Sequence, residues 1–229
     1  MLRFLILVIL AIGTCGCGGG GGGESVSTTP ATPETPSDPN LITLGTVTFN
    51  ITNSQDFSTH PLGQLSDSLI FSYKINNGGV TSTTFSQFDT YSKVTKRGVP
   101  CWLKTSVVMG TTNLAYYAKS IAGDICLIQL GSNEFSPWTW LPASLAVGAS
   151  WTADQPHTIS STDYQVLEVN ATSPSGRTGC IKIQVITHDT ATGAPISNSR
   201  YFLKPGFGCL IIDQGDTLAD SIYLDTVSG

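Results

Sequence analysis

The segment Cys180-Ile181-Lys182-Ile183-Gln184-Val185-Ile186 decides the fold class of this chain. Its apolar residues at 181, 183 and 185 alternate with lysine and glutamine, a period of two that is typical of a β-strand with one buried face. No apolar period of 3.6 residues continues elsewhere for three turns with caps, as a helix would need. The sequence therefore predicts an all-β protein with no substantial helix beyond its first residues.

Turn residues divide the rest of the chain into further candidate strands. Asn77-Gly78-Gly79, Met109-Gly110, Gly123-Asp124 and Pro205-Gly206 are combinations that favour tight β-turns. The composition between such turns favours strands at 99–108, 114–120, 125–130, 163–169 and 210–212.

One order of landmarks occurs twice, which indicates an internal repeat. Cysteine, strand, tyrosine, glycine turn, cysteine and apolar strand follow one another from Cys101 to Gly131, and again from Cys180 to Gly215. The first cysteines of the two series are 79 residues apart and the second cysteines are 83 apart. We expect two copies, at about 61–131 and 142–215.

The repeat predicts a large antiparallel sheet. About five strands in each copy give roughly 10–11 strands, and a sheet of this size must curve, close or stack. A curved half-barrel, a closed barrel and a two-sheet sandwich all agree with the pattern.

The first residues have the pattern of a bacterial export signal. Arg3 precedes an apolar run from Phe4 to Ile12, which is shorter than the ~20 residues that a membrane-spanning helix needs. The following Gly16-Cys17 resembles a lipobox, in which the cysteine is lipidated before cleavage, and Cys15 is the alternative acceptor. We therefore expect a signal peptide at 1–16 and a lipid on Cys17 that tethers the chain to a membrane.

The residues behind Cys17 indicate a location and a linker. The residue after Cys17 is Gly18 and not an aspartate, which resembles the pattern that sorts lipoproteins to the outer membrane. Residues 17–40 continue with glycine, proline and threonine, a composition that resists ordering. We expect a bacterial envelope protein anchored in the outer membrane, on its periplasmic face or at the cell surface. A disordered linker at 17–40 precedes a β domain at 41–229.

The charge of the chain argues against nucleic acid as a partner. Without Arg3 the chain has 10 basic and 16 acidic residues, a net charge of −6, whereas nucleic-acid binding needs a basic face. The nearest approach to a basic patch is Lys93, Lys96, Arg97 and Lys104, which we interpret as a solvated surface.

The four cysteines of the β domain predict two disulfides, because the number is even in an exported protein. Pairing within each copy gives Cys101–Cys126 and Cys180–Cys209, and pairing between copies is the alternative. In a plain meander the cysteines of one copy flank a middle strand and lie ~9.6 Å apart. A disulfide needs Cα atoms about 4.4–6.8 Å apart, so a bulge or tight curl would be required. No short CxxC spacing supports a zinc site.

No catalytic, metal or cofactor motif occurs in the chain. His60, His157 and His188 stand in no HExxH or HxH arrangement, and we expect them in turns or at the surface. No Gly-x-Ser-x-Gly segment occurs either. We therefore predict a protein that is not an enzyme and that holds no cofactor and no metal.

Aromatic residues gather in the connection between the two copies. Trp138, Trp140 and Trp151, with Phe135, fall within 17 residues. They are candidates for an aromatic surface that stacks a sugar or holds an apolar ligand. The alternative, which we favour, is a hydrophobic plug where the copies meet, since tryptophan combines a large apolar area with one donor.

Three short motifs resemble a loose group of β-rich bacterial lipoproteins of unknown function. They are Pro61-Leu62, Leu141-Pro142 followed by Gly148-Ala149-Ser150-Trp151, and Pro205-Gly206-Phe207-Gly208. The resemblance implies a membrane partner through the lipid anchor and leaves any protein or glycan partner open. We expect a non-enzymatic structural or binding module. The alternatives are a carrier of lipid or another apolar ligand in a β concavity, as in the periplasmic lipoprotein carriers, and an envelope hydrolase.

Overall fold

The computed structural model describes residues 38–154 and 160–229. The expected signal peptide, the lipid acceptors Cys17 and Cys15, and the linker up to residue 37 lie outside the described residues. A compact unit runs from Asn40 to Gly229.

The described residues form strands and no helix, which confirms the all-β prediction. None of them belongs to a helix that is long and apolar enough to cross a membrane. The strands are β1 (Leu41–Leu44), β2 (Val47–Asn50), β3 (Ile70–Asn77), β4 (Val80–Lys96), β5 (Val99–Val108), β6 (Thr111–Lys119), β7 (Ile125–Leu130), β8 (Asn133–Leu141), β9 (Ser150–Asp154), β10 (Ser160–Ala171), β11 (Cys180–Asp189), β12 (Pro195–Leu203), β13 (Asp213–Thr217) and β14 (Asp220–Ser228).

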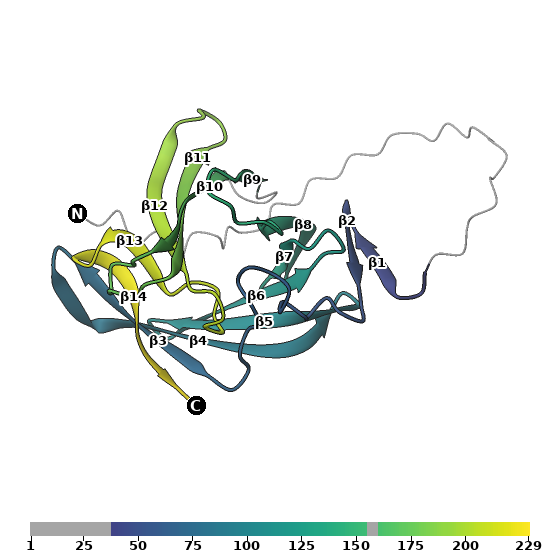
Figure 1. The fold of residues 1–229 in the computed structure, drawn as a ribbon, viewed down its shortest axis with the longest axis horizontal. Helices are drawn as coiled ribbons and strands as arrows, with labels where there is room; N and C mark the ends of the chain where they lie inside the picture. The colour runs from purple at the N-terminus through teal and green to yellow at the C-terminus, as the bar shows by residue number, and fades with distance from the viewer. Residues whose placement is uncertain (1–37, 155–159) are drawn as a thin grey trace. The chain divides into compact units, whose positions relative to one another are not determined.

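Twelve of these strands form one antiparallel sheet that is nearly closed into a barrel. Its order is β8-β7-β6-β5-β4-β3-β14-β13-β12-β11-β10-β9, so the only pairing of strands far apart in sequence joins β3 to β14 (Figure 1). The two edges, β8 and β9, are consecutive in the chain. Strands β1 and β2 form a separate hairpin.

The sheet has more strands than the expected 10–11 because the connection between the copies contains a strand. Residues 133–141 form β8, although Pro137 lies within it. Proline cannot donate to a ladder and is tolerated mainly in edge strands, and β8 is an edge of the sheet. Because Pro137 lies beside two tryptophans, the sequence suggested a connection here, whereas the chain forms an edge strand.

The two expected copies fall on two successive meanders of the sheet. Residues 61–131 include β3 to β7, and residues 142–215 include β9 to β12 and the start of β13. Each series then continues into one more strand, β8 or β14. The descent of the two meanders from one duplicated sequence stays a prediction.

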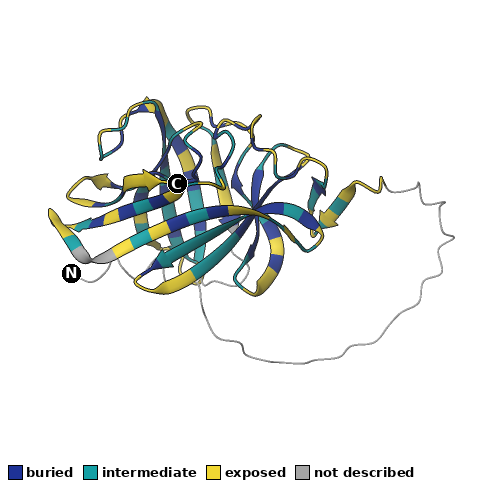
Figure 2. Cartoon of the chain, turned by 90° about the horizontal axis from the view of Figure 1, so that it is seen from below, coloured by how far each residue is buried: buried dark blue, intermediate teal, exposed yellow. Residues whose placement is uncertain are grey.

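The inner face of the sheet carries the larger core. Ile181, Ile183 and Val185 of β11 are buried, as their alternation predicted, and Figure 2 shows buried and exposed bands alternating along the strands. Side chains from both meanders meet in this inner core, and many are aromatic. They include Phe71, Tyr91, Trp102, Tyr117, Trp140, Tyr164 and Phe202.

A second, smaller core lies on the opposite face of β5, β6 and β7, beneath the β1–β2 hairpin. Phe49 of β2 is fully buried there, in one cluster with Cys101, Ala118 and Cys126. Phe49 also forms an antiparallel bridge with Ser120. These three strands are thus covered on both faces, which explains why five of the six residues of β7 are buried.

Candidate functional site

Two charged side chains lie on the inner face of the sheet. The register of β4 and β5 pairs Lys93 with Trp102, Tyr91 with Lys104, and Asp89 with Ser106. Because alternate residues of a strand share a face, Asp89 and Lys104 point to the same side as the buried Tyr91 and Trp102.

Asp89 and Lys104 form a buried ion pair. The Lys104 Nζ lies 2.7 Å from Asp89 Oδ2, and the side chains are 15% and 1% exposed respectively. The other carboxylate oxygen accepts hydrogen bonds from Ser106 Oγ at 2.5 Å and Gln87 Nε2 at 3.0 Å. The carboxylate therefore has three donors, and its capacity to accept more is largely used.

Five tyrosines from five strands line the same inner face: Tyr73, Tyr91, Tyr117, Tyr164 and Tyr201. Burial raises the pKa of every one of them. All five phenols are therefore protonated at neutral pH and can donate hydrogen bonds.

Only two of these hydroxyls have partners in the described chain. The Tyr73 hydroxyl donates to the Ile211 carbonyl at 2.7 Å, and the Tyr91 hydroxyl accepts from the Leu210 amide at 3.1 Å. The hydroxyls of Tyr117, Tyr164 and Tyr201 have no protein partner among the described residues, but none of them is a buried polar atom without a partner. These three hydroxyls therefore reach solvent, and water can satisfy them.

Trp151 adds another unpartnered donor. Its Nε1 atom is buried and has no hydrogen-bond partner among the described residues, and its ring stacks on Tyr164 with centroids 5.1 Å apart and planes 4° apart. We call Lys104, Tyr117, Tyr164, Tyr201 and Trp151 the donor cluster. Burial is the largest cause that raises the pKa of Tyr164 and Tyr201; the charge of ionised Tyr117 adds to both shifts, and Lys104 opposes that of Tyr201.

The three predicted tryptophans lie on the two edge strands rather than on an exposed platform. Trp140 is buried and packs edge-on against Tyr117 with ring centroids 5.6 Å apart. Trp138 and Trp151 are partly buried against the inner core. This placement brings Trp140 and Trp151 into contact with two tyrosines of the donor cluster.

The four cysteines are buried free thiols in the structure. Cys126 pairs with Ala118 of β6, and Cys101 precedes Trp102, which pairs with Tyr117 of the same strand. One strand therefore separates Cys101 from Cys126. Burial raises the pKa of both thiols to about 12. The pairing of the four cysteines into disulfides stays a prediction.

His60 lies in a turn, as expected, but it is buried rather than at the surface. It is 5% exposed, its Nε2 donates to the Pro142 carbonyl at 2.9 Å, and its Nδ1 accepts from the Leu62 amide at 3.1 Å. Desolvation is the largest effect on His60 and lowers its pKa. The neutral ring thus links the residue that precedes the first expected copy to Pro142, the first residue of the second copy.

Acid should weaken the protein through His60. Because its folded pKa is lower than its unfolded pKa of about 6.5, the unfolded chain binds more protons, so stability falls as the pH drops below about 6.5. Denaturant unfolding at pH 8 and pH 5 should show a steeper loss for the wild type than for His60→Gln. His188→Gln is the control, and it should still show the acid-induced loss of stability that His60 causes. An equal loss in wild type and His60→Gln would contradict the assignment.

His188 does not stand in a nucleophile–imidazole–carboxylate order among the described residues. His188 Nε2 lies 3.0 Å from Asp163 Oδ2, and Thr152 Oγ1 donates to Asp163 Oδ1 at 2.6 Å. The Asp163 carboxylate lies between the Thr152 hydroxyl and the His188 imidazole. In a catalytic triad the imidazole lies between the nucleophilic hydroxyl and the carboxylate. His157 lies outside the described residues. No group of three potential metal ligands occurs among those that are described.

The four basic residues do not form one solvated patch, so that interpretation is corrected. Lys104 points inward to Asp89. Lys93 and Lys96 lie over the rings of Trp102 and Tyr116, 5.3 and 5.2 Å from the centroids. Arg97 donates to the Phe135 carbonyl at 2.6 Å. Each cation therefore has its own partner.

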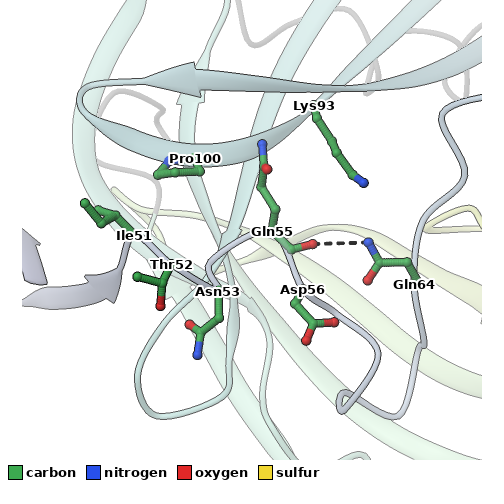
Figure 3. Close-up of a pocket in the computed structure, with 8 residues that line it drawn as sticks. All are labelled: Ile51, Thr52, Asn53, Gln55, Asp56, Gln64, Lys93 and Pro100. Atoms are coloured by element: carbon green, nitrogen blue, oxygen red, sulfur yellow. Dashed lines mark hydrogen bonds between the residues drawn. The ribbon is translucent and has the colours of Figure 1, made fainter. Parts of the chain in front are cut away.

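A surface pocket of about 280 Å³ lies between the segment 51–64 and strands β4 and β5 (Figure 3). Gln55 Nε2 donates to the carbonyls of Val94 and Cys101 at 2.9 and 2.8 Å. Gln64 Oε1 accepts from the Phe57 amide at 2.8 Å. The side-chain amides of Gln55 and Gln64 thus serve to hold the segment 51–64 on the sheet. The donor cluster is therefore a stronger candidate site than this pocket.

Comparisons with protein-family models, curated proteins and solved structures found no match to this chain. Sequence reasoning singled out Trp151 and Lys104 but missed the buried Asp89 and the three tyrosines. One signal could have found Asp89: Gln87, Asp89 and Tyr91 alternate within a strand, so the acid shares a face with an aromatic residue.

Proposed function

We propose that this chain is a non-enzymatic binding module of the bacterial envelope that holds a small polar ligand against the inner face of its sheet. The buried Asp89–Lys104 pair and the buried, unpartnered indole N–H of Trp151 carry the proposal. Such buried groups are costly to a protein that serves only as a scaffold. An unpartnered buried donor costs about 1–3 kcal/mol, and apolar residues in place of a buried ion pair are often as stable or more so.

The same groups favour a polar ligand over the alternative of a lipid carrier. An acyl chain is best held by an apolar lining, because it offers no acceptor to phenol, indole or ammonium groups. The hydrolase alternative needs a nucleophile beside a base, and no described residues of the inner face were found in that arrangement.

The proposed location rests on the sequence. Lipid on Cys17, with Cys15 as the alternative acceptor, would tether the module to the outer membrane as in the lipoprotein group that the chain resembles. Two disulfides in the β domain belong to the same proposal of an exported protein, and peptide mapping without reduction distinguishes Cys101–Cys126 from a bond between the copies.

Substitution of the lipid acceptor tests the anchor. Cys17→Ser should remove acylation and release the chain from the membrane fraction, because the lipid is the proposed attachment. Fractionation followed by intact mass measurement reports both effects. Cys15→Ser serves as the matched control and should stay in the membrane. If Cys17→Ser stays lipidated while Cys15→Ser is released, the acceptor is Cys15.

Native mass spectrometry of the Cys17→Ser chain, purified without denaturation, tests the binding function. A bound small molecule that leaves after unfolding is the expected result. Binding is contradicted if the chain is empty and a broad set of small polar compounds fails to raise its melting temperature.

A further inference from the structure

We propose that the pocket between the segment 51–64 and strands β4 and β5 is a second binding site, which takes a small zwitterion with one ammonium and one carboxylate group. Free amino acids have this chemistry. Two opposite charges, Lys93 and Asp56, line this one pocket, and its residues are other than those of the donor cluster. The second site therefore does not depend on the binding proposed for the inner face.

The walls of the pocket are fixed by hydrogen bonds that leave its two charged groups unused. Gln55 Nε2 donates to two backbone carbonyls of β4 and β5. Gln64 Oε1 accepts from the Phe57 amide, and Gln64 Nε2 donates to the Gln55 carbonyl at 3.2 Å (Figure 3). The same carbonyl accepts from Trp102 Nε1 at 2.8 Å. The pocket is thus formed before a ligand arrives, which lowers the entropic cost of binding.

Lys93 supplies the positive charge of the pocket. Its ammonium lies 5.3 Å from the centroid of the Trp102 ring, and Figure 3 shows the side chain pointing from β4 toward Gln64. The ring attracts the cation without a carboxylate, and Lys93 forms no ion pair with any described residue. Its three protons can therefore be donated to the carboxylate of a ligand.

Asp56 supplies the negative charge. Its Oδ1 accepts from the Ser58 amide at 3.0 Å, and hydrogen bonding from the side chain and the amide of Ser58 lowers the pKa of Asp56. Lys119 adds little to this shift, and its ammonium donates to Thr59 Oγ1 at 3.1 Å. A carboxylate offers about four acceptor positions, so part of Asp56 stays open to a ligand ammonium.

The two charges together select a zwitterion over a simple ion. An anion bound to Lys93 would also face Asp56 in the same small pocket, and a cation bound to Asp56 would face Lys93. Like charges at such short range repel each other. A ligand with both charges gains from both residues and avoids this repulsion.

The size and the remaining lining of the pocket suit an amino acid. The volume of about 280 Å³ is just below the range of about 300–1,000 Å³ for ligand pockets. A sphere of this volume is about 8 Å across, which leaves room for a few heavy atoms between two hydrogen bonds of about 2.8–3.0 Å. Ile51 and Pro100 line the end away from Gln64 in the view of Figure 3, where an aliphatic side chain could pack.

Valine and two singly charged analogues test the inference on the full chain carrying Cys17→Ser. 3-Methylbutanoate lacks the amino group of valine, and isobutylamine lacks its carboxylate. Valine should bind at least tenfold more tightly than either analogue in calorimetry, because each analogue loses a charge-assisted hydrogen bond. It should also shift the side-chain amide signals of Asn53 and Gln64 in NMR spectra, which places it in this pocket.

Two variants assign the charges. Lys93→Gln should weaken valine binding to the level of isobutylamine without weakening isobutylamine, because only the contact with the carboxylate is lost. Asp56→Asn should weaken valine binding to the level of 3-methylbutanoate without weakening 3-methylbutanoate. Lys96→Gln is the control and should leave valine binding unchanged, since the Lys96 ammonium lies over Tyr116 of the outer core.

Three results would overturn the second site. The first is that neither valine nor another common amino acid binds. The second is equal binding of valine and both analogues. The third is that Lys93→Gln weakens valine and isobutylamine alike, as a purely structural role of Lys93 would require.

Discussion

Replacing Lys104 with methionine should lower the free energy of unfolding by about 3–5 kcal/mol, because it leaves a buried carboxylate without its counterion. Asp89 is 1% exposed and would keep only Ser106 and Gln87 as partners. Urea unfolding at neutral pH, followed by tryptophan fluorescence, measures the change. A loss of this size is a large fraction of the total stability of a typical domain, about 5–15 kcal/mol.

The double variant Lys104→Met, Asp89→Leu separates charge from packing. It should recover most of the loss, because no isolated charge remains in the core. Lys96→Met is the matched control and should cost about 0.5–1 kcal/mol, since it removes a cation from the ring of Tyr116. If the single and double variants are equally destabilised, the ion pair does not explain the effect.

Replacing Trp102 with alanine should cost about 3–5 kcal/mol, the range for large aromatic side chains in cores. Trp102 is 1% exposed in the inner core, and its Nε1 donates to the Gln55 carbonyl at 2.8 Å. The substitution therefore opens a cavity and also loosens the segment 51–64 that Gln55 fastens to β4 and β5. Chemical unfolding gives the loss of stability.

Two further variants distinguish the packing of Trp102 from its hydrogen bond. Trp102→Phe should retain much of the packing and lose the bond, with a smaller cost than alanine. Trp138→Ala, at a partly buried residue beside the same core, should cost less than Trp102→Ala. A loss below about 1 kcal/mol for Trp102→Ala would contradict its place in the core.

The alternation in β11 was enough to predict an all-β chain, but it could not identify every buried face. Tyr116 and Tyr117 are neighbours in β6 and both are buried, because the inner core covers one face and the β1–β2 hairpin covers the other. A sheet covered on both faces loses the alternation from which burial is read. Cys101 and Cys126 therefore gave no sign that they belong to the outer core.

The candidate site was harder to predict, because it depends on register. Asp89 and Lys104 are brought together by the turn at Arg97 and Gly98 and by the pairing of β4 with β5. The tryptophan cluster was visible in the sequence, but its place on two edge strands was not, since Pro137 argued against a strand at β8.

The pairing of β3 with β14 has a consequence for how the protein is made. This ladder joins residues about 150 positions apart, such as Ile75 and Ile222, and contacts of such long range form slowly. During synthesis, β3 would emerge long before its partner and would present an unpaired strand edge that other chains could join. The whole sheet can therefore close only after its last strand, β14, has been synthesised.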